Sequence, residues 1–153
     1  MEDPTRNYSK NEILAFAQAV RIQEEAFTWL IEYECIELAA VAEYIIYGKQ
    51  PALQWLTERS YVTLLAFIRV LEQDDAEAFT FLLKSNHKEW AATLKATEDD
   101  ADAMEWLFMY RLPHFIFLAD ALLHLARISG ADGTSGGYGV HSKISSPSGR
   151  WRF

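Results

Sequence analysis

Histidines and carboxylates on predicted helices are the first residues to consider for chemistry. Asp120 and His124 are four residues apart, which places them on one face of a helix. Together with Glu34 and Glu37 they could hold a metal ion inside a helical bundle. A di-iron site needs a Glu-x-x-His pair on each of two helices, and the sequence has none. The favoured interpretation is therefore a hydrogen-bonded histidine on a partly exposed face.

A run of small residues near the C-terminus is the sharpest local motif. It comprises Gly133, Thr134, Ser135, Gly136 and Gly137. Successive small residues let backbone N–H groups converge on an anion, and the threonine hydroxyl adds a donor. Glycine-serine loops are common, so the motif gains weight only from its neighbours.

Those neighbours are Arg111 and His114, which form Arg-x-x-His on the preceding predicted helix. This helix followed by Gly-Thr-Ser-Gly-Gly-Tyr resembles the C-terminal part of the tryptophan 2,3-dioxygenase and indoleamine dioxygenase superfamily, over about 30 residues. The resemblance implies an all-helical fold and a haem whose iron is bound by His114. It also implies a loop over an aromatic substrate, with Thr134 near the amino-acid end of that substrate.

Two further assignments depend on the same resemblance. Phe67 and Arg69 are the residues that could serve the distal, substrate-binding half of the pocket. His124 is the alternative iron ligand to His114. Because the chain is short for this superfamily, we expect a dimer to complete such a pocket.

The single cysteine gives no sign of catalysis. Cys35 lies mid-helix in the predicted structure and has no apparent base beside it. Burial among Ile36 and Leu38 would raise the pKa of its thiol. Phosphate-binding and dinucleotide-binding fingerprints are absent from the sequence, as is a serine nucleophile in a strand-turn-helix setting.

The first half of the chain predicts two helices. No glycine or proline occurs between Ser9 and Tyr47, and apolar residues recur there at helical spacing. We therefore expect one long helix, or two nearly continuous ones, ending at Gly48. Pro51 suits the first turn of the next helix, which should run to about Leu71.

The second half of the chain predicts two or three more helices. Asp74 followed by Glu77 resembles a capping pair for a helix over 76–96. The acidic run over 97–102 opens a further helix, which Pro113 should kink or split, and its second half should end at Gly130. The pattern shows no strand and no evident internal repeat. It predicts an all-α antiparallel bundle of four to five helices over residues 1–128.

Residues 129–153 form a tail that differs in kind. This Gly-rich tail holds six of the seven glycines. It has three basic residues against one acidic, whereas 11 basic and 21 acidic residues precede it. Its apolar residues are Tyr138, Val140, Ile144, Trp151 and Phe153. We expect the tail to pack on the acidic body or on a neighbouring subunit.

Composition restricts the function classes. With a formal charge of −8 and a pI near 4.9, the chain is a poor candidate for binding nucleic acid or anionic lipid. The most apolar segment, over 27–47, contains four glutamates, which a membrane span would rarely tolerate. The N-terminal residues lack the pattern of a secretory signal, so we expect a cytoplasmic protein.

Two functions from different classes follow. The first is haem-dependent oxidation of an aromatic, amino-acid-like substrate, as the resemblance implies. The alternative is a non-enzymatic, acidic interaction protein, such as an inhibitor, an immunity factor or an assembly subunit of a homo-oligomer. In the alternative, the basic aromatic terminus over 150–153 would anchor the protein to a neighbour, since Trp and Arg are favoured anchor residues.

Overall fold

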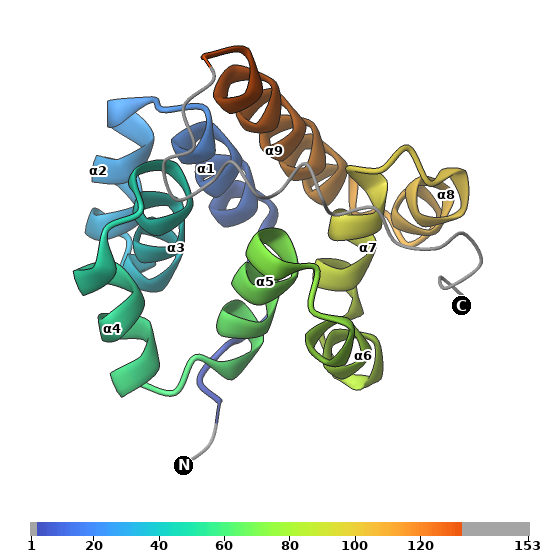
Figure 1. Cartoon of the computed structure of the whole chain (residues 1–153), viewed down its shortest axis with the longest axis horizontal. Coiled ribbons are helices and arrows are strands. Elements are labelled where there is room, and N and C mark those ends of the chain that lie inside the picture. The colour runs from blue at the N-terminus through green and yellow to red at the C-terminus, as the bar shows by residue number, and fades with distance from the viewer. Residues whose placement is uncertain (1–2, 133–153) are drawn as a thin grey trace.

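The computed structural model describes residues 3–132, and that part of the chain is entirely helical apart from its connections (Figure 1). The all-α prediction is confirmed. The described span contains nine helices, however, where four to five were expected. They are α1 (Lys10–Val20), α2 (Glu24–Glu32), α3 (Ile36–Tyr47), α4 (Gln50–Glu58), α5 (Val62–Gln73), α6 (Ala76–Lys84), α7 (Lys88–Ala96), α8 (Ala101–Met109) and α9 (Pro113–Asp132).

The prediction of one long helix, or two nearly continuous ones, over 9–47 is wrong, because the chain turns twice there and forms three helices. Ile22 and Glu34 have φ values of 65° and 62°, in the left-handed region that ends a helix. Ser60 interrupts the predicted helix over 51–71 in the same way, at φ 60°. None of these three residues is a glycine. Residue type alone therefore gave no stop signal at these positions.

The other predicted helix boundaries also differ from those in the structure. The helix expected over 76–96 divides into α6 and α7, because Ser85 is extended, at φ −81° and ψ 173°. Its N-cap is Asp75, whose carboxylate accepts from two backbone N–H groups, while Asp74 ends α5. Pro113 begins α9 rather than kinking a helix, as its missing N–H permits. Gly130 does not end α9, which continues to Asp132.

A repeat of about 26 residues runs through the fold, contrary to the expectation of none. Even-numbered helices carry a buried alanine followed four residues later by a buried leucine. The alanines are Ala26, Ala52, Ala78 and Ala103, and the leucines are Leu30, Leu56, Leu82 and Leu107. Each set is spaced by 26, 26 and 25 residues. Each repeat is a helical hairpin that must stack on its neighbours to bury its apolar face.

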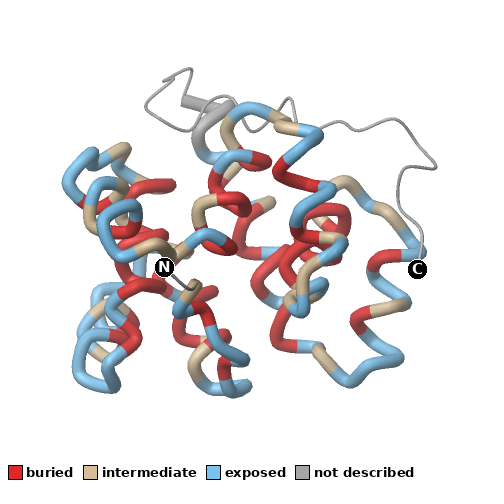
Figure 2. Tube along the Cα trace, turned by 90° about the horizontal axis from the view of Figure 1, so that it is seen from below, coloured by how far each residue is buried: buried red, intermediate tan, exposed pale blue. Residues whose placement is uncertain are grey.

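The odd-numbered helices form an inner ring, and the even-numbered helices lie outside it (Figure 1). Each inner helix packs against the next, and the extensive packing of α1 on α9 closes the ring. Each outer helix packs against the inner helices before and after it in the chain. Figure 2 shows the result: buried residues gather toward the centre and exposed residues follow the outer helices.

Aromatic packing around Trp90 fills the ring. The indole of Trp90, on α7, is fully buried. The rings of Phe16 on α1, Phe67 on α5 and Phe115 on α9 surround it, with centroids 5.1–6.1 Å away. Tyr8 meets the indole edge-on at 6.3 Å. One side chain thus joins three inner helices and the segment that precedes α1.

Candidate binding groove

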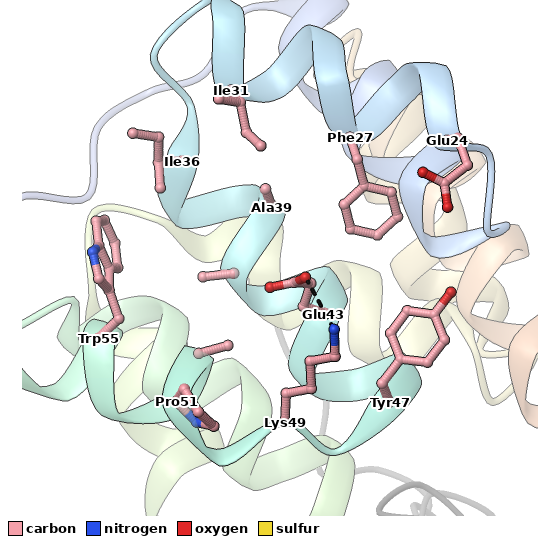
Figure 3. Close-up of a pocket in the computed structure, with 12 residues that line it drawn as sticks. Glu24, Phe27, Ile31, Ile36, Ala39, Glu43, Tyr47, Lys49, Pro51 and Trp55 are labelled. Carbon is pink, nitrogen blue, oxygen red and sulfur yellow. Dashed lines mark ion pairs between the residues drawn. The ribbon is translucent and has the colours of Figure 1, made fainter.

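An apolar groove lies on the outer surface where α2 and α4 flank α3 (Figure 3). Its volume is about 500 Å³. Phe27 and Tyr47 lie at one side and Trp55 at the other, and two alanines of α3 form the floor. The full lining is Glu24, Phe27, Ile31, Ile36, Ala39, Ala40, Glu43, Tyr47, Lys49, Pro51, Ala52 and Trp55.

The groove follows from the architecture. Successive outer helices each pack down onto inner helices, so a channel remains between them above the inner helix that they share. Alanines on α3 keep its outward face low, because a methyl group cannot fill that channel. We call this hollow the α2–α4 groove.

The groove recurs one repeat later. Eight of its lining positions, advanced by 26 residues, are the lining of a second groove of about 350 Å³ beside α5 and α6. Its residues are Val62, Leu65, Ala66, Arg69, Asp75, Glu77, Ala78 and Phe81. Because the positions match and the side chains differ, the two grooves form a natural pair for comparison.

Large apolar side chains around the α2–α4 groove remain open to solvent. Ile31, Ile36 and Tyr47 are 55%, 44% and 51% exposed. Tyr33, just after α2, is 59% exposed and stacks on Trp29 at 4.3 Å. Clustered exposed apolar residues of this kind mark interaction surfaces more often than isolated ones do.

The α2–α4 groove carries a net negative charge. Glu24 and Glu43 are its carboxylates, and Lys49 is its one cation. The Lys49 ammonium lies 3.6 Å from a Glu43 carboxylate oxygen, which leaves Glu24 as the excess charge (Figure 3). In a molecule whose overall charge is −8, this site favours basic ligands over acidic ones.

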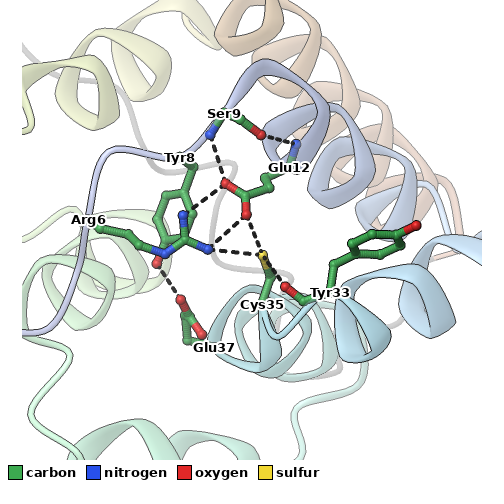
Figure 4. Close-up of polar contacts among 7 residues, drawn as sticks. All are labelled: Arg6, Tyr8, Ser9, Glu12, Tyr33, Cys35 and Glu37. Atoms are coloured by element: carbon green, nitrogen blue, oxygen red, sulfur yellow. Dashed lines mark hydrogen bonds and ion pairs between the residues drawn. The ribbon is translucent and has the colours of Figure 1, made fainter.

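A polar cluster fastens the segment before α1 to the inner helices (Figure 4). Arg6 binds the Glu12 carboxylate through both guanidinium nitrogens, at 3.0 and 2.8 Å. Glu12 also closes a capping box with Ser9 at the start of α1. This guanidinium lowers the pKa of Glu12 to about 2, because the paired carboxylate is favoured in its charged form.

Glu37 and Cys35 complete the cluster. The Tyr8 hydroxyl donates to the buried Glu37 carboxylate at 2.7 Å. Burial, reinforced by a hydrogen bond to Glu12, raises the pKa of the Cys35 thiol to about 12. The direction of this shift agrees with the sequence expectation, but Cys35 is the N-cap that precedes α3 and does not lie mid-helix as expected. The thiol stays protonated at neutral pH and donates to Glu12 at 3.1 Å, so it is a structural group and a poor nucleophile.

The structure puts the two candidate haem ligands in different surroundings. His114 is buried at the start of α9 beside Phe115, and its Nδ1 has no hydrogen-bond partner. His124 is exposed, ten residues further along α9, which is about 15 Å at the helical rise. Burial lowers the pKa of His114, with a further contribution from the charge of Lys10.

These surroundings do not fit a haem bound through the described residues. Neither histidine lines the α2–α4 groove or its repeat beside α5 and α6. A porphyrin at His114 would require α9 to separate from the core that Phe115 and Leu118 fill. The prediction of haem-dependent oxidation is untested and stays a prediction. A Soret band that appears with haemin and is lost on replacing one of these histidines would support it.

The two residues predicted for the distal half of a haem pocket do not share a site either. Phe67 is buried against Trp90, whereas Arg69 is exposed and lines the groove beside α5 and α6. They therefore face opposite sides of α5. The substrate-binding residues proposed in the glycine-rich loop, Gly133, Thr134, Ser135, Gly136 and Gly137, lie outside the described residues.

Two of the three carboxylates weighed as metal ligands are engaged elsewhere, and the third, Glu34, is exposed. Asp120 forms an ion pair with Arg21, and Glu37 accepts from Tyr8. Within residues 3–132, histidine, cysteine, aspartate and glutamate side chains form no group of three or more suited to a metal ion. Over the same span, no helix has the length and apolar character needed to cross a membrane.

Sequence reasoning missed the α2–α4 groove. The signal was present as the repeated Ala-x-x-aromatic-Leu pattern, with Trp29, Trp55, Phe81 and Trp106 at its aromatic position. Comparison with known proteins gives no further guide, because no family model, curated protein or solved structure matches the chain.

Proposed function

We propose that the protein is a non-enzymatic interaction protein, a small helical-repeat scaffold that binds a basic, apolar segment of a protein partner in the α2–α4 groove. The observation that carries this proposal is the groove itself. It combines an apolar floor, exposed apolar residues around it and excess negative charge.

The shape of the groove favours a polypeptide segment. A channel between two helices accepts side chains that recur along one face of a helix or strand. The apolar groups Ile36, Phe27 and Trp55 supply the contact area. Aromatic groups of this kind are frequent at interface hot spots.

Charge complementarity identifies the chemistry of the partner. Glu24 and Glu43 at the groove, and the acidic body around them, would attract lysine or arginine side chains at long range. Attraction between exposed charges weakens within a Debye length of about 8 Å at physiological salt. Affinity for such a segment should therefore fall as salt is added, while the apolar contact persists.

The lining chemistry gives no support to catalysis at this site. Serine, cysteine and histidine are all absent from the twelve lining residues. These are the side chains that most often act as activated nucleophiles or as general bases near neutral pH. Recognition, rather than bond breaking, is the function that the groove supports best.

Titration with designed peptides tests the proposal. A fluorescein-labelled amphipathic peptide of leucine and lysine would be titrated with the full-length protein, in parallel with a matched peptide of leucine and glutamate. We expect measurable binding of the lysine peptide alone. The substitution Ile36→Asp should weaken that binding at least about tenfold, since it places a charge at the apolar rim.

The repeat supplies a matched control. Val62 occupies the position of Ile36 one repeat later and is similarly exposed, at 41% against 44%. Val62→Asp adds the same charge to the other groove and should leave binding unchanged. Equal loss in the two variants, or equal binding of the glutamate peptide, would overturn the proposal.

A further inference from the structure

A third hollow, between α8 and α9, is an incomplete version of the α2–α4 groove. Its α9 residues Pro113, Ile116, Phe117 and Asp120 correspond in the repeat to Ile36, Ala39, Ala40 and Glu43. On α8, Met104 takes the place of Phe27. In the α2–α4 groove, α4 supplies a second wall. The described residues supply no such wall here, so we call this site the half-groove.

Apolar side chains are unusually open around the half-groove. Phe117 is 44% exposed and Met104 is 38% exposed. At the end of α8, Phe108, Met109 and Tyr110 are 73%, 67% and 63% exposed. These are the highest exposures among the large apolar residues described. A covering segment would remove this apolar surface from water, which is favourable.

The repeat predicts where in the sequence a further outer helix should begin. Outer helices begin at residues 24, 50, 76 and 101, so a fifth would begin near residue 127. Instead, α9 continues to Asp132, well past the length of the other inner helices. The first residues of that expected helix therefore belong to α9, and residues 133–153 are the part of the given sequence that follows α9.

We propose that residues 133–153 cover the half-groove of their own molecule and supply the wall that the next outer helix supplies in the α2–α4 groove. This inference concerns a different surface from the proposed function and does not depend on it.

The chemistry of the two surfaces is complementary. The covering segment contains three basic residues and no acidic one, whereas residues 1–132 contain 11 basic and 22 acidic residues. The half-groove itself is lined by Asp99 and by Asp120, whose charge is offset by its ion pair with Arg21. Trp151 and Phe153 supply aromatic groups to meet Phe117 and Met104, and Arg150 and Arg152 alternate with them.

The covering segment is long enough to reach the site within one molecule. The far end of the half-groove, at Pro113, is 19 residues from Asp132, which is about 29 Å along α9. Twenty-one residues extend to about 70 Å at most, and a glycine-rich chain of this length averages about 25 Å between its ends. The connection therefore favours contact within the same chain over contact with a second copy, because it raises the effective concentration.

Photocrosslinking of the full-length chain tests the inference. Trp151 would be replaced by p-benzoylphenylalanine, and the products would be sized on a denaturing gel and mapped by mass spectrometry. We expect crosslinks within one chain to residues 104–123. The substitution Phe117→Glu should lower their yield at least fivefold, and Phe81→Glu, at a side chain of similar exposure, 42%, should leave the yield unchanged.

Three results would overturn the inference. Crosslinks that join two chains would assign the segment to a neighbouring copy. Crosslinks to the α2–α4 groove would assign it to the wrong surface, and would also predict competition with the lysine peptide. A lack of crosslinks under conditions where a control photoreactive residue at Phe115 reacts within the core would show that the half-groove is uncovered.

Discussion

The inner and outer helices of this molecule use aromatic residues in opposite ways. On the inner helices, aromatic rings converge: Trp90 is fully buried and meets Phe16, Phe67 and Phe115. On the outer helices, the repeated aromatic position lies at the surface, where Trp106 packs against Tyr110 at 4.7 Å. The same residue type thus stabilises the fold in one layer and, in the function proposed above, would supply contact area to a partner in the other.

This contrast separates the residues that stabilise the fold from those that are proposed to bind a partner. Each outer helix contributes a buried alanine and a buried leucine to the interior, and α6 also contributes Phe79, whereas many of the remaining outer-helix residues are exposed. The outward-facing groove positions of the inner helices differ between repeats: α5 has Arg69 where α3 has Glu43 and α9 has Asp120. Neighbouring grooves can therefore differ in charge while the ring beneath them stays the same.

The largest effect should come from the centre of the ring. Trp90→Ala removes a fully buried indole that joins three inner helices, and it should lower the free energy of unfolding by about 3–5 kcal/mol. Urea denaturation monitored by far-ultraviolet circular dichroism would measure this loss. The partly exposed Trp106 gives the control, and Trp106→Ala should cost much less. Equal losses would show that the two layers do not divide as described.

A smaller effect is expected where the N-terminal segment meets the inner layer. Glu37→Ala removes the acceptor of the buried Tyr8 hydroxyl, which should cost about 1–3 kcal/mol. Glu105→Ala, at an exposed glutamate of α8, should change stability by less than about 0.5 kcal/mol. Tyr8→Phe combined with Glu37→Ala should lose less than the sum of the two single changes, which a double-mutant cycle by urea denaturation would measure.

Acid should weaken the same junction. In the folded protein Arg6 lowers the pKa of Glu12 to about 2, so this carboxylate stabilises the fold fully above its ordinary pKa. The contribution is lost as the pH falls from about 4.5 to about 2. An ion pair this open to solvent is worth at most about 1 kcal/mol. Glu12→Gln should show a correspondingly shallower acid destabilisation, measured as the free energy of unfolding between pH 5 and pH 3.

The smallest expected effect tests the burial of His114. Burial lowers its pKa, so the unfolded chain takes up a proton below about pH 6.5 more readily than the folded protein does. Stability should therefore decrease as the pH falls from 7 toward 5, and this part of the decrease should vanish in His114→Leu. A shift in the opposite direction would mean that the imidazole gains a charged partner.

The sequence predicted helices well and helix ends poorly. Apolar spacing identified helical structure throughout residues 10–47, but the chain leaves the helix at Ile22 and Glu34. An isolated isoleucine at φ 65° is unfavourable by roughly 1–2 kcal/mol, so its own preference would continue the helix. The ring overrides that preference, because turning back at Ile22 lets Ala26 and Leu30 bury against the neighbouring inner helices.

The candidate site shows the same division. The residues of the α2–α4 groove were visible in the sequence as ordinary core aromatics and helix glutamates. Their grouping into one groove was not visible in the sequence. Phe27, Ile36 and Trp55 come from three different helices, and the continuous helix expected over 9–47 would have kept Phe27 and Ile36 apart. The haem hypothesis placed Arg69 and His114 in one pocket by resemblance. In the structure Arg69 is on α5 and His114 is on α9, and these two helices each pack against α7.

By itself the sequence determined the all-α class and the acidic character of the protein, because both follow from composition and local periodicity. It also held the Ala-x-x-aromatic-Leu repeat. Tertiary structure decided where the helices end and which side chains share a groove. It also decided that, in the described span, the odd-numbered helices form an inner ring and the even-numbered helices lie outside it. These features depend on contacts between residues distant in the chain, which no local preference encodes.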